Sequence, residues 1–162
     1  MTETPTKERM MALRIVVGGD NAGFNYKQAL RKDLESDDRV EIVEDVGVGD
    51  PEDDTSYPNV AIAAAEKIAK GEADRALLIC GTGLGVAIAA NKVKGIRAVT
   101  AHDSYSVQRS VLSNNAQVLC MGERVVGLEL ARVLVKEWLG LEFDPQSSSA
   151  AKVDDICAYE GD

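Results

Sequence analysis

The chain has 162 residues, of which 45% are hydrophobic and 28% are charged, and its formal net charge is −9 at pH 7. This composition is typical of one globular domain that is large enough to bury a core. The negative charge argues against a nucleic acid or an anionic membrane as partner. No apolar run in the sequence is long enough to span a bilayer.

The first residues lack the apolar stretch of a secretory signal, and residues 1–11 are expected to form a flexible tail. Three cysteines, Cys80, Cys120 and Cys157, show no metal-ligand spacing, and their odd number favours a reducing compartment. We therefore expect a cytoplasmic protein without a metal site. The single histidine, His102, has no supporting constellation for zinc binding or for a Ser-His-Asp triad.

The first part of the chain alternates apolar strand-like runs with helical patterns. Residues 13–17 predict a strand that ends in GGDNAG, and residues 24–34 carry apolar side chains at helical spacing. Residues 40–46 predict a second strand. The acidic loop that follows is rich in Gly and Pro and is long for an α/β unit, which suggests a functional role. Pro58 begins the next helix, which is predicted over 59–70.

The central stretch, LLICGTGLGVAIAANK, predicts a buried strand at 76–79, a glycine turn and an alanine-rich helix. This geometry aims backbone N–H groups and a helix N-terminus at an anion. Cys80 stands at the carboxyl end of the strand, and Thr82 stands between two glycines. A thiolate in this place is stabilised, so Cys80 could act as a base or a nucleophile. The alternative is a buried structural cysteine beside an ordinary tight turn.

The last part of the chain continues the alternation of strands and helices. Strands are predicted at 96–101 and 117–121, separated by a helix and the polar break SNNA. The helices are predicted at 104–112, 125–140 and 150–159. The last of these follows a polar linker, and we expect it to reach away from the core onto a neighbouring molecule.

Five strands that alternate with helices predict an α/β fold, a Rossmann-like three-layer α/β/α domain with a five-stranded parallel sheet. We assign residues 12–142 to this domain and residues 143–162 to a C-terminal linker and helix that pack on a partner subunit. Ligands of such sheets bind outside the carboxyl ends of the strands. The side chains that we place at this edge or near it are Asp20, Tyr57, Cys80, Thr82, His102, Asn114 and Arg124.

Several of these candidates have a structural alternative. Asp20 could cap a turn or a helix. Tyr57 could anchor its loop, and His102 could be a surface or helix-capping residue.

Five segments together resemble the type B ribose 5-phosphate isomerases, a family that includes the galactose 6-phosphate isomerase subunits: GGDNAGF, SYPNVA, ICGTGLGVAIAANKVKGIRAV, SNNAQVL and GERVVGLELA. The resemblance covers residues 13–159. Members are homodimers or tetramers whose sites form between two subunits and use neither metal nor nucleotide. The resemblance therefore implies an aldose–ketose isomerase that acts on a phosphorylated small sugar without a cofactor.

The resemblance also implies roles for individual residues. Cys80 would be the base that moves a proton between C1 and C2, and Thr82 would shuttle the hydroxyl and carbonyl proton. Backbone N–H groups of the glycine turn would hold the cis-enediolate, as an oxyanion hole does. The substrate- and anion-binding residues would be Asp20, Asn21, Tyr57, Gly81, Gly83, Gly85, His102, Ser113, Asn114, Arg124, Ser148 and Lys152.

The chain departs from the family pattern at residues that serve ring opening and phosphate binding. Asn21 stands where a histidine is common, and Ser113 replaces the histidine assigned to opening the sugar ring. Ser148 and Lys152 replace two arginines that clasp the phosphate. His102 could take over a lost phosphate or hydroxyl contact, or act as the missing acid.

These departures suggest a substrate that needs no ring opening. A tetrose 4-phosphate cannot form a furanose, because its O4 is esterified. The segments GD-x-AG, THDSYS and LSNNAQ resemble the erythritol-pathway branch, whose members interconvert D-erythrulose 4-phosphate and D-erythrose 4-phosphate. We favour this substrate pair, and the ribose 5-phosphate/ribulose 5-phosphate pair is the alternative.

Three functions from other classes fit the sequence less well. A nucleotide-binding module would need the Walker lysine or the full dinucleotide fingerprint, and the turn has neither. An inactive structural subunit would not need Cys80 and Thr82 together. A thiol hydrolase would need a clear Cys-His pair.

Overall fold

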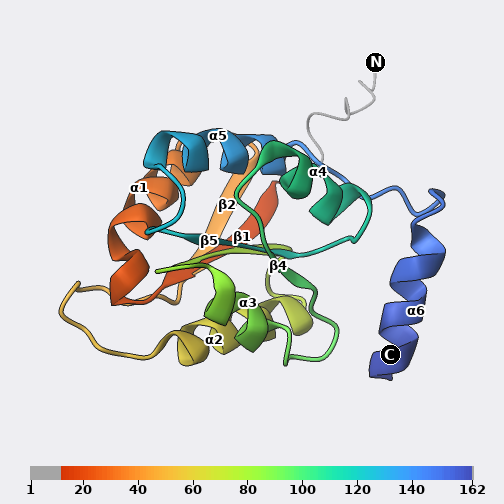
Figure 1. The fold of residues 1–162 in the computed structure, drawn as a ribbon, viewed down its shortest axis with the longest axis horizontal. Coiled ribbons are helices and arrows are strands. Elements are labelled where there is room, and N and C mark those ends of the chain that lie inside the picture. Colours follow the sequence, from red (N-terminus) through yellow and green to blue (C-terminus); the bar gives the residue numbers. More distant parts are fainter. Residues whose placement is uncertain (1–11, 162) are drawn as a thin grey trace, which may run out of the picture.

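The computed structural model describes residues 12–161 (Figure 1). The predicted N-terminal tail, residues 1–11, lies outside the described residues. Within the described part, five parallel strands form one sheet in the order β2-β1-β3-β5-β4. The strands are β1 (Leu13–Gly19), β2 (Val40–Asp45), β3 (Arg75–Cys80), β4 (Ala98–Thr100) and β5 (Val118–Gly122).

Helices cover both faces of this sheet (Figure 1). One face carries α1 (Phe24–Glu35), α4 (Ser104–Leu112) and α5 (Leu128–Leu139), and the other carries α2 (Tyr57–Ala69) and α3 (Leu84–Ala90). The predicted three-layer α/β/α fold is therefore confirmed. No helix within residues 12–161 combines the length and the apolar character that a membrane span requires.

A hydrophobic cluster lies on each face of the sheet, between the sheet and the helices that cover that face. Side chains alternate along a strand, so β3 contributes to both clusters. Leu77 and Ile79 pack with Trp138 on the α1/α5 side, whereas Leu78 and Cys80 pack on the α2/α3 side. This alternation places the thiol of Cys80 on the face that carries α3.

Helix α5 begins later than the sequence predicted. The backbone N–H groups of Val125 and Val126 donate to the carbonyl of Gly122 at 3.0 and 3.1 Å. These residues therefore form a turn after β5, and the helix begins at Leu128. The predicted start at residue 125 was wrong because apolar residues continue through the turn.

Strand β4 is shorter than predicted and lies at the edge of the sheet. The side chain of Asn91 pairs with the backbone of Ala98, accepting from its N–H at 2.7 Å and donating to its carbonyl at 2.8 Å. The amide of Asn91 thus takes the place of a further strand at this edge. The ladder ends at Thr100, two residues before His102.

The last helix, α6 (Ala150–Glu160), stands beside the domain rather than in either layer (Figure 1). Val153 is its buried residue, while Ile156 and Tyr159 are exposed. The carboxylate of Glu160 accepts a hydrogen bond from the N–H of Gly95 at 2.9 Å. That residues 143–162 pack on a partner subunit stays a prediction.

Candidate active site

Cys80 lies at the point where β3 turns into α3. Its side chain is 4% exposed, and its Sγ accepts a hydrogen bond from the N–H of Gly83 at 3.1 Å. Gly83 has a φ of 77°, which favours glycine, and a Cβ there would lie 2.8 Å from the backbone of Met121. Glycine at this position therefore lets the loop fold back over β5 and brings a backbone donor to the sulfur.

Thr82 projects from the same loop and is exposed. Its Oγ1 accepts a hydrogen bond from the N–H of Leu84 at 3.2 Å. Because the oxygen accepts in this bond, the hydroxyl proton can be donated to a bound molecule. A thiol and a hydroxyl two residues apart thus share the first turn after β3.

The end of strand β5 packs against this loop. Gly122 is the register partner of Cys80, and a Cβ on Gly122 would lie 2.5 Å from the carbonyl carbon of Thr82. Further along, the N–H of Arg124 donates to the carbonyl of Gly81 at 3.0 Å. The guanidinium of Arg124 also lies over Gly81, 3.2 Å from where a Cβ would stand. An exposed cation is therefore held beside the loop from Cys80 to Leu84, which we call the thiol loop, where it could bind a phosphate.

Tyr57 reaches the loop from the start of α2. Its ring lies directly against Gly85, where a Cβ would collide with the ring and the phenol oxygen. The side chain of Tyr57 keeps 39% of its surface exposed. Because Gly85 has no side chain, the ring of Tyr57 at the start of α2 can pack against the first turn of α3. This contact leaves the phenol at the rim of the candidate site.

Asp20 follows β1 at the same edge of the sheet. Its carboxylate accepts a hydrogen bond from the N–H of Gly23 at 3.2 Å and caps the short 3₁₀ turn Asn21–Gly23. The turn-capping interpretation of Asp20 therefore holds in this structure. Asn21 is exposed in that turn, and Asp20 is half-buried.

His102 is held by the backbone of β5. Its Nε2 accepts a hydrogen bond from the N–H of Gly122 at 2.9 Å, so the ring is neutral with its proton on Nδ1. Burial lowers the pKa of His102 from its ordinary value, and the charge of Asp103 opposes this shift. The residue that caps α4 is Asp103 and not His102, because the carboxylate of Asp103 accepts a hydrogen bond from the N–H of Ser106 at 2.8 Å.

Ser113 and Asn114 lie at the opposite edge of the sheet. They follow α4 and precede β5, whose other end carries Gly122 beside Cys80. The four steps from Val118 to Gly122 alone cover about 13 Å at ~3.3 Å per residue. The sequence analysis placed Asn114 at the carboxyl edge or near it, and this placement was wrong, because SNNA enters the strand rather than leaving it.

Asn114 instead lines a groove of about 480 Å³ between the amino edge of the sheet and α6. Ile156, Tyr159 and Glu160 of α6 line the same groove. Ser148 lies just before α6 and Lys152 lies in its first turn. Helix α6 itself stands outside the two helix layers (Figure 1). One copy of the chain therefore does not bring these residues to Cys80.

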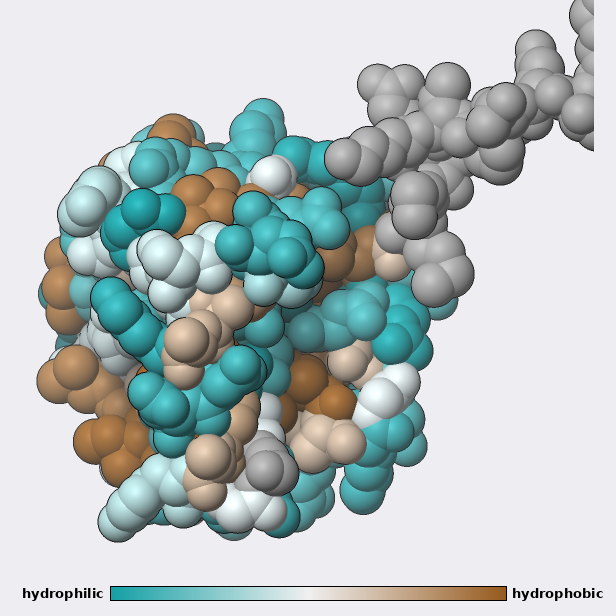
Figure 2. All heavy atoms as spheres, turned by 90° about the vertical axis from the view of Figure 1, so that its right-hand side faces the viewer, coloured by the Kyte–Doolittle hydropathy of each residue, from teal (hydrophilic) through white to brown (hydrophobic). Residues whose placement is uncertain are grey.

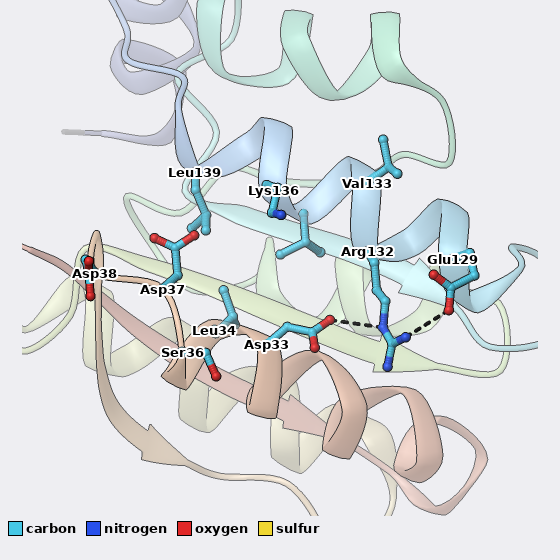
Figure 3. Close-up of a pocket in the computed structure, with 11 residues that line it drawn as sticks. Asp33, Leu34, Ser36, Asp37, Asp38, Glu129, Arg132, Val133, Lys136 and Leu139 are labelled. Atoms are coloured by element: carbon cyan, nitrogen blue, oxygen red, sulfur yellow. Dashed lines mark hydrogen bonds and ion pairs between the residues drawn. The ribbon is translucent and has the colours of Figure 1, made fainter.

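A larger groove of about 750 Å³ lies between α1 and α5 (Figure 3). Arg132 sits in it between two carboxylates, at 3.0 Å from Asp33 and 2.8 Å from Glu129. None of the predicted site residues lines this groove. Within residues 12–161, no three His, Cys, Asp or Glu side chains converge as metal ligands would.

Two features near the site escaped the sequence analysis. Lys27 is 2% exposed, and its Nζ lies 2.7 Å from Asp45 and 3.1 Å from the carbonyl of Val48. Lys27 lies three and seven residues before Leu30 and Leu34, on the apolar face of α1, and this spacing could have indicated that its side chain is buried. The hydroxyl of Thr100 donates to the carbonyl of Gly83 at 2.6 Å, and nothing in the sequence indicated this contact.

The chain is similar in sequence to known proteins. The family model described as Ribose/Galactose Isomerase matches residues 15–156. D-erythrulose-4-phosphate isomerase 2 of Mycolicibacterium smegmatis is 89% identical over 151 residues, which are 93% of this chain and 99% of that protein. D-erythrulose-4-phosphate isomerase of Pectobacterium atrosepticum is 42% identical over 148 residues, which are 91% and 95% of the two chains.

A solved structure shares the fold. Ribose-5-phosphate isomerase B of Clostridium thermocellum matches with a TM-score of 0.85 at 40% sequence identity, covering 91% of this chain and 97% of that one. The predicted family, an aldose–ketose isomerase family of phosphorylated sugars, is thus confirmed by sequence and by fold. The chain belongs to the Ribose/Galactose Isomerase family.

Proposed function

We propose that this chain interconverts D-erythrulose 4-phosphate and D-erythrose 4-phosphate through a cis-enediolate, with Cys80 as the base. The observation that carries the proposal is the loop after β3, in which the sulfur of Cys80 stands 3.1 Å from the N–H of Gly83 beside the hydroxyl of Thr82. The two curated relatives reported above carry the name of this activity.

The reaction needs a base for a weakly acidic C–H bond and a site for the negative charge that develops on oxygen. In the proposed course, the thiolate of Cys80 takes a proton from C1 of the ketose, and the electron pair forms the C1–C2 double bond of the enediolate. Backbone N–H groups of the glycine turn stabilise the oxyanion. Thr82 passes a proton between O1 and O2, and Cys80 returns its proton to C2, which yields the aldose.

The other residues at this edge would bind the substrate. Arg124 would bind the phosphate, and the position of its guanidinium over Gly81 supports this role. The carboxylate of Asp20, the amide of Asn21 and the phenol of Tyr57 would meet the sugar hydroxyls. Their place at the same edge of the sheet supports these roles, with Asn21 and Tyr57 exposed and Asp20 half-buried.

We further propose that a second copy of the chain completes the site in a homodimer or tetramer. Ser113, Asn114, Ser148 and Lys152 lie away from the thiol loop of their own chain, so they would reach the substrate of a neighbouring copy.

Exposed apolar side chains support such an assembly: Leu84 and Ile88 on α3, and Ile156 and Tyr159 on α6. Figure 2 looks onto the side that carries α6 and shows hydrophobic patches among hydrophilic surface. Such patches commonly mark protein–protein contacts.

The decisive experiment compares kcat/KM for D-erythrulose 4-phosphate and D-ribose 5-phosphate with one enzyme preparation. We expect a large preference for the four-carbon sugar, because Ser113 cannot supply the acid that opens a ring. Efficient turnover of ribose 5-phosphate would contradict this substrate and favour the five-carbon alternative.

The role of the base is tested by Cys80→Ser, with Cys157→Ser as the matched cysteine control. We expect the first variant to lose isomerisation and the second to keep it. Iodoacetate should inactivate the enzyme unless substrate protects Cys80, and activity that survives the loss of Cys80 would refute the proposed mechanism.

A further inference from the structure

Two polar side chains, one at the end of β4 and one two residues beyond it, contact the backbone of the loop after β3 and of the end of β5. The hydroxyl of Thr100 donates to the carbonyl of Gly83 at 2.6 Å. The Nε2 of His102 accepts from the N–H of Gly122 at 2.9 Å. The strand order β3-β5-β4 makes these contacts possible, because β5 lies between the thiol loop and β4.

The contact made by Thr100 orients one peptide plane. The peptide between Gly83 and Leu84 is planar, and in a trans peptide the N–H points away from the carbonyl. Thr100 holds this carbonyl on one side, and the N–H of Leu84 donates to Oγ1 of Thr82 at 3.2 Å on the other. Thr100 therefore fixes the backbone donor that sets the position of the Thr82 hydroxyl.

The contact made by His102 fixes the backbone of Gly122, against which the backbone of Thr82 packs. The pairing of β4 with β5 ends at Thr100, and the last backbone hydrogen bond between the two segments runs from the N–H of Ala101 to the carbonyl of Cys120. His102 then supplies the acceptor for Gly122 that the strand no longer provides. The backbone of Gly122 lies so close to Thr82 that a Cβ would stand 2.5 to 2.7 Å from three of its backbone atoms.

We propose that Thr100 and His102 are positioning residues that hold the Thr82 hydroxyl in place, and that His102 is not a substrate ligand. The catalytic consequence rests on the proposed function, since Thr82 moves a proton only if the chain is an isomerase. The structural part stands without it, because both contacts act on the backbone of the loop and of β5. Neither side chain needs to touch the sugar.

The first test reads the backbone and not the activity. The chain has one histidine, so the ¹⁵N signals of the tag-free protein report its tautomer without ambiguity. We expect the proton on Nδ1. We expect faster amide exchange of Gly122 in His102→Ala and of Leu84 in Thr100→Val, with Ser36→Ala as a control on the exposed end of α1. Unchanged exchange at these amides would overturn the proposal.

The second test separates positioning from substrate binding. We expect Thr100→Val and His102→Ala to lower kcat about tenfold, the effect of roughly one lost hydrogen bond, with little change in KM. Thr100→Ser keeps the hydroxyl and should restore kcat. If His102→Ala fails to fold, His102→Asn replaces it. A raised KM with unchanged kcat would overturn the proposal in favour of direct substrate contact.

The two tests also distinguish the proposal from the function on which it rests. If the wild-type protein isomerises neither the four-carbon nor the five-carbon sugar phosphate, the proposed function fails. Amide exchange and the histidine tautomer then still decide whether Thr100 and His102 hold the loop.

Discussion

Gly122 has no side chain at the point where β5 meets the loop that holds Cys80 and Thr82. In Gly122→Ala the new methyl would lie 2.5 Å from the carbonyl carbon of Thr82, so the loop must move. We expect the free energy of unfolding to fall by ~1–3 kcal/mol and isomerase activity to be largely lost. Chemical denaturation and kcat measure the two effects. Gly49→Ala, which meets open space, should change neither, and an active Gly122→Ala would contradict this view of the loop.

His102 links the same region to pH. Its pKa is lowered from 6.5, chiefly by burial, so the unfolded chain binds a proton more readily than the folded one. The contribution of neutral His102 to stability is complete above about pH 6.5 and is lost as the pH falls through the lower pKa of the folded state. We expect wild-type protein to lose more unfolding free energy than His102→Gln between pH 7.5 and pH 5. Parallel losses in the two proteins would rule this out.

At the scale of elements, Lys27 joins α1 to the end of β2. Its ammonium lies 2.7 Å from Asp45, and the other carboxylate oxygen of Asp45 accepts from the N–H of Gly47 at 2.9 Å. Gly47 packs against the backbone of Gly19, next to Asp20. This buried pair therefore connects the loop after β2 to the end of β1 at the carboxyl edge of the sheet.

Lys27→Met removes the cation and leaves the carboxylate of Asp45 largely buried, with Arg31 still 3.0 Å away. We expect the free energy of unfolding to fall by up to ~3 kcal/mol, since removing one partner of a buried ion pair costs stability and Arg31 compensates the remaining charge only in part. Thermal and urea denaturation would measure the loss. Lys32→Met is the control, because Lys32 is exposed on the same helix and should matter little. Equal stability of the two variants would contradict the structural role of Lys27.

At the scale of the whole molecule, the proposal that two copies of the chain share one site can be tested directly. We expect Cys80→Ser and Asn114→Ala each to be nearly inactive alone. When both are expressed together with different tags, a mixed dimer has one site with intact Cys80 and intact Asn114, and activity should return. The assay is isomerisation by the doubly purified mixed species. Inactive mixed dimers, or a fully active Asn114→Ala, would show that the site belongs to a single chain.

Short-range patterns were enough to predict most of the fold. The apolar run, the glycines and the alanines around Cys80 predicted β3, the turn and α3, since each signal lies within a few residues along the chain. The helix over Ser104–Leu112 was predicted with the bounds that it has. The sequence also identified Cys80, Thr82 and Arg124, which the structure brings together at one edge of the sheet.

Long-range geometry decided the rest. The side of the sheet on which Asn114 lies depends on whether its loop enters or leaves β5. The contacts from Thr100 to Gly83 and from His102 to Gly122 depend on strand order, which places β5 between two segments that are distant in sequence. Residue patterns record local propensity and burial, whereas these contacts arise only when separate strands pair, and so the tertiary structure was needed to find them.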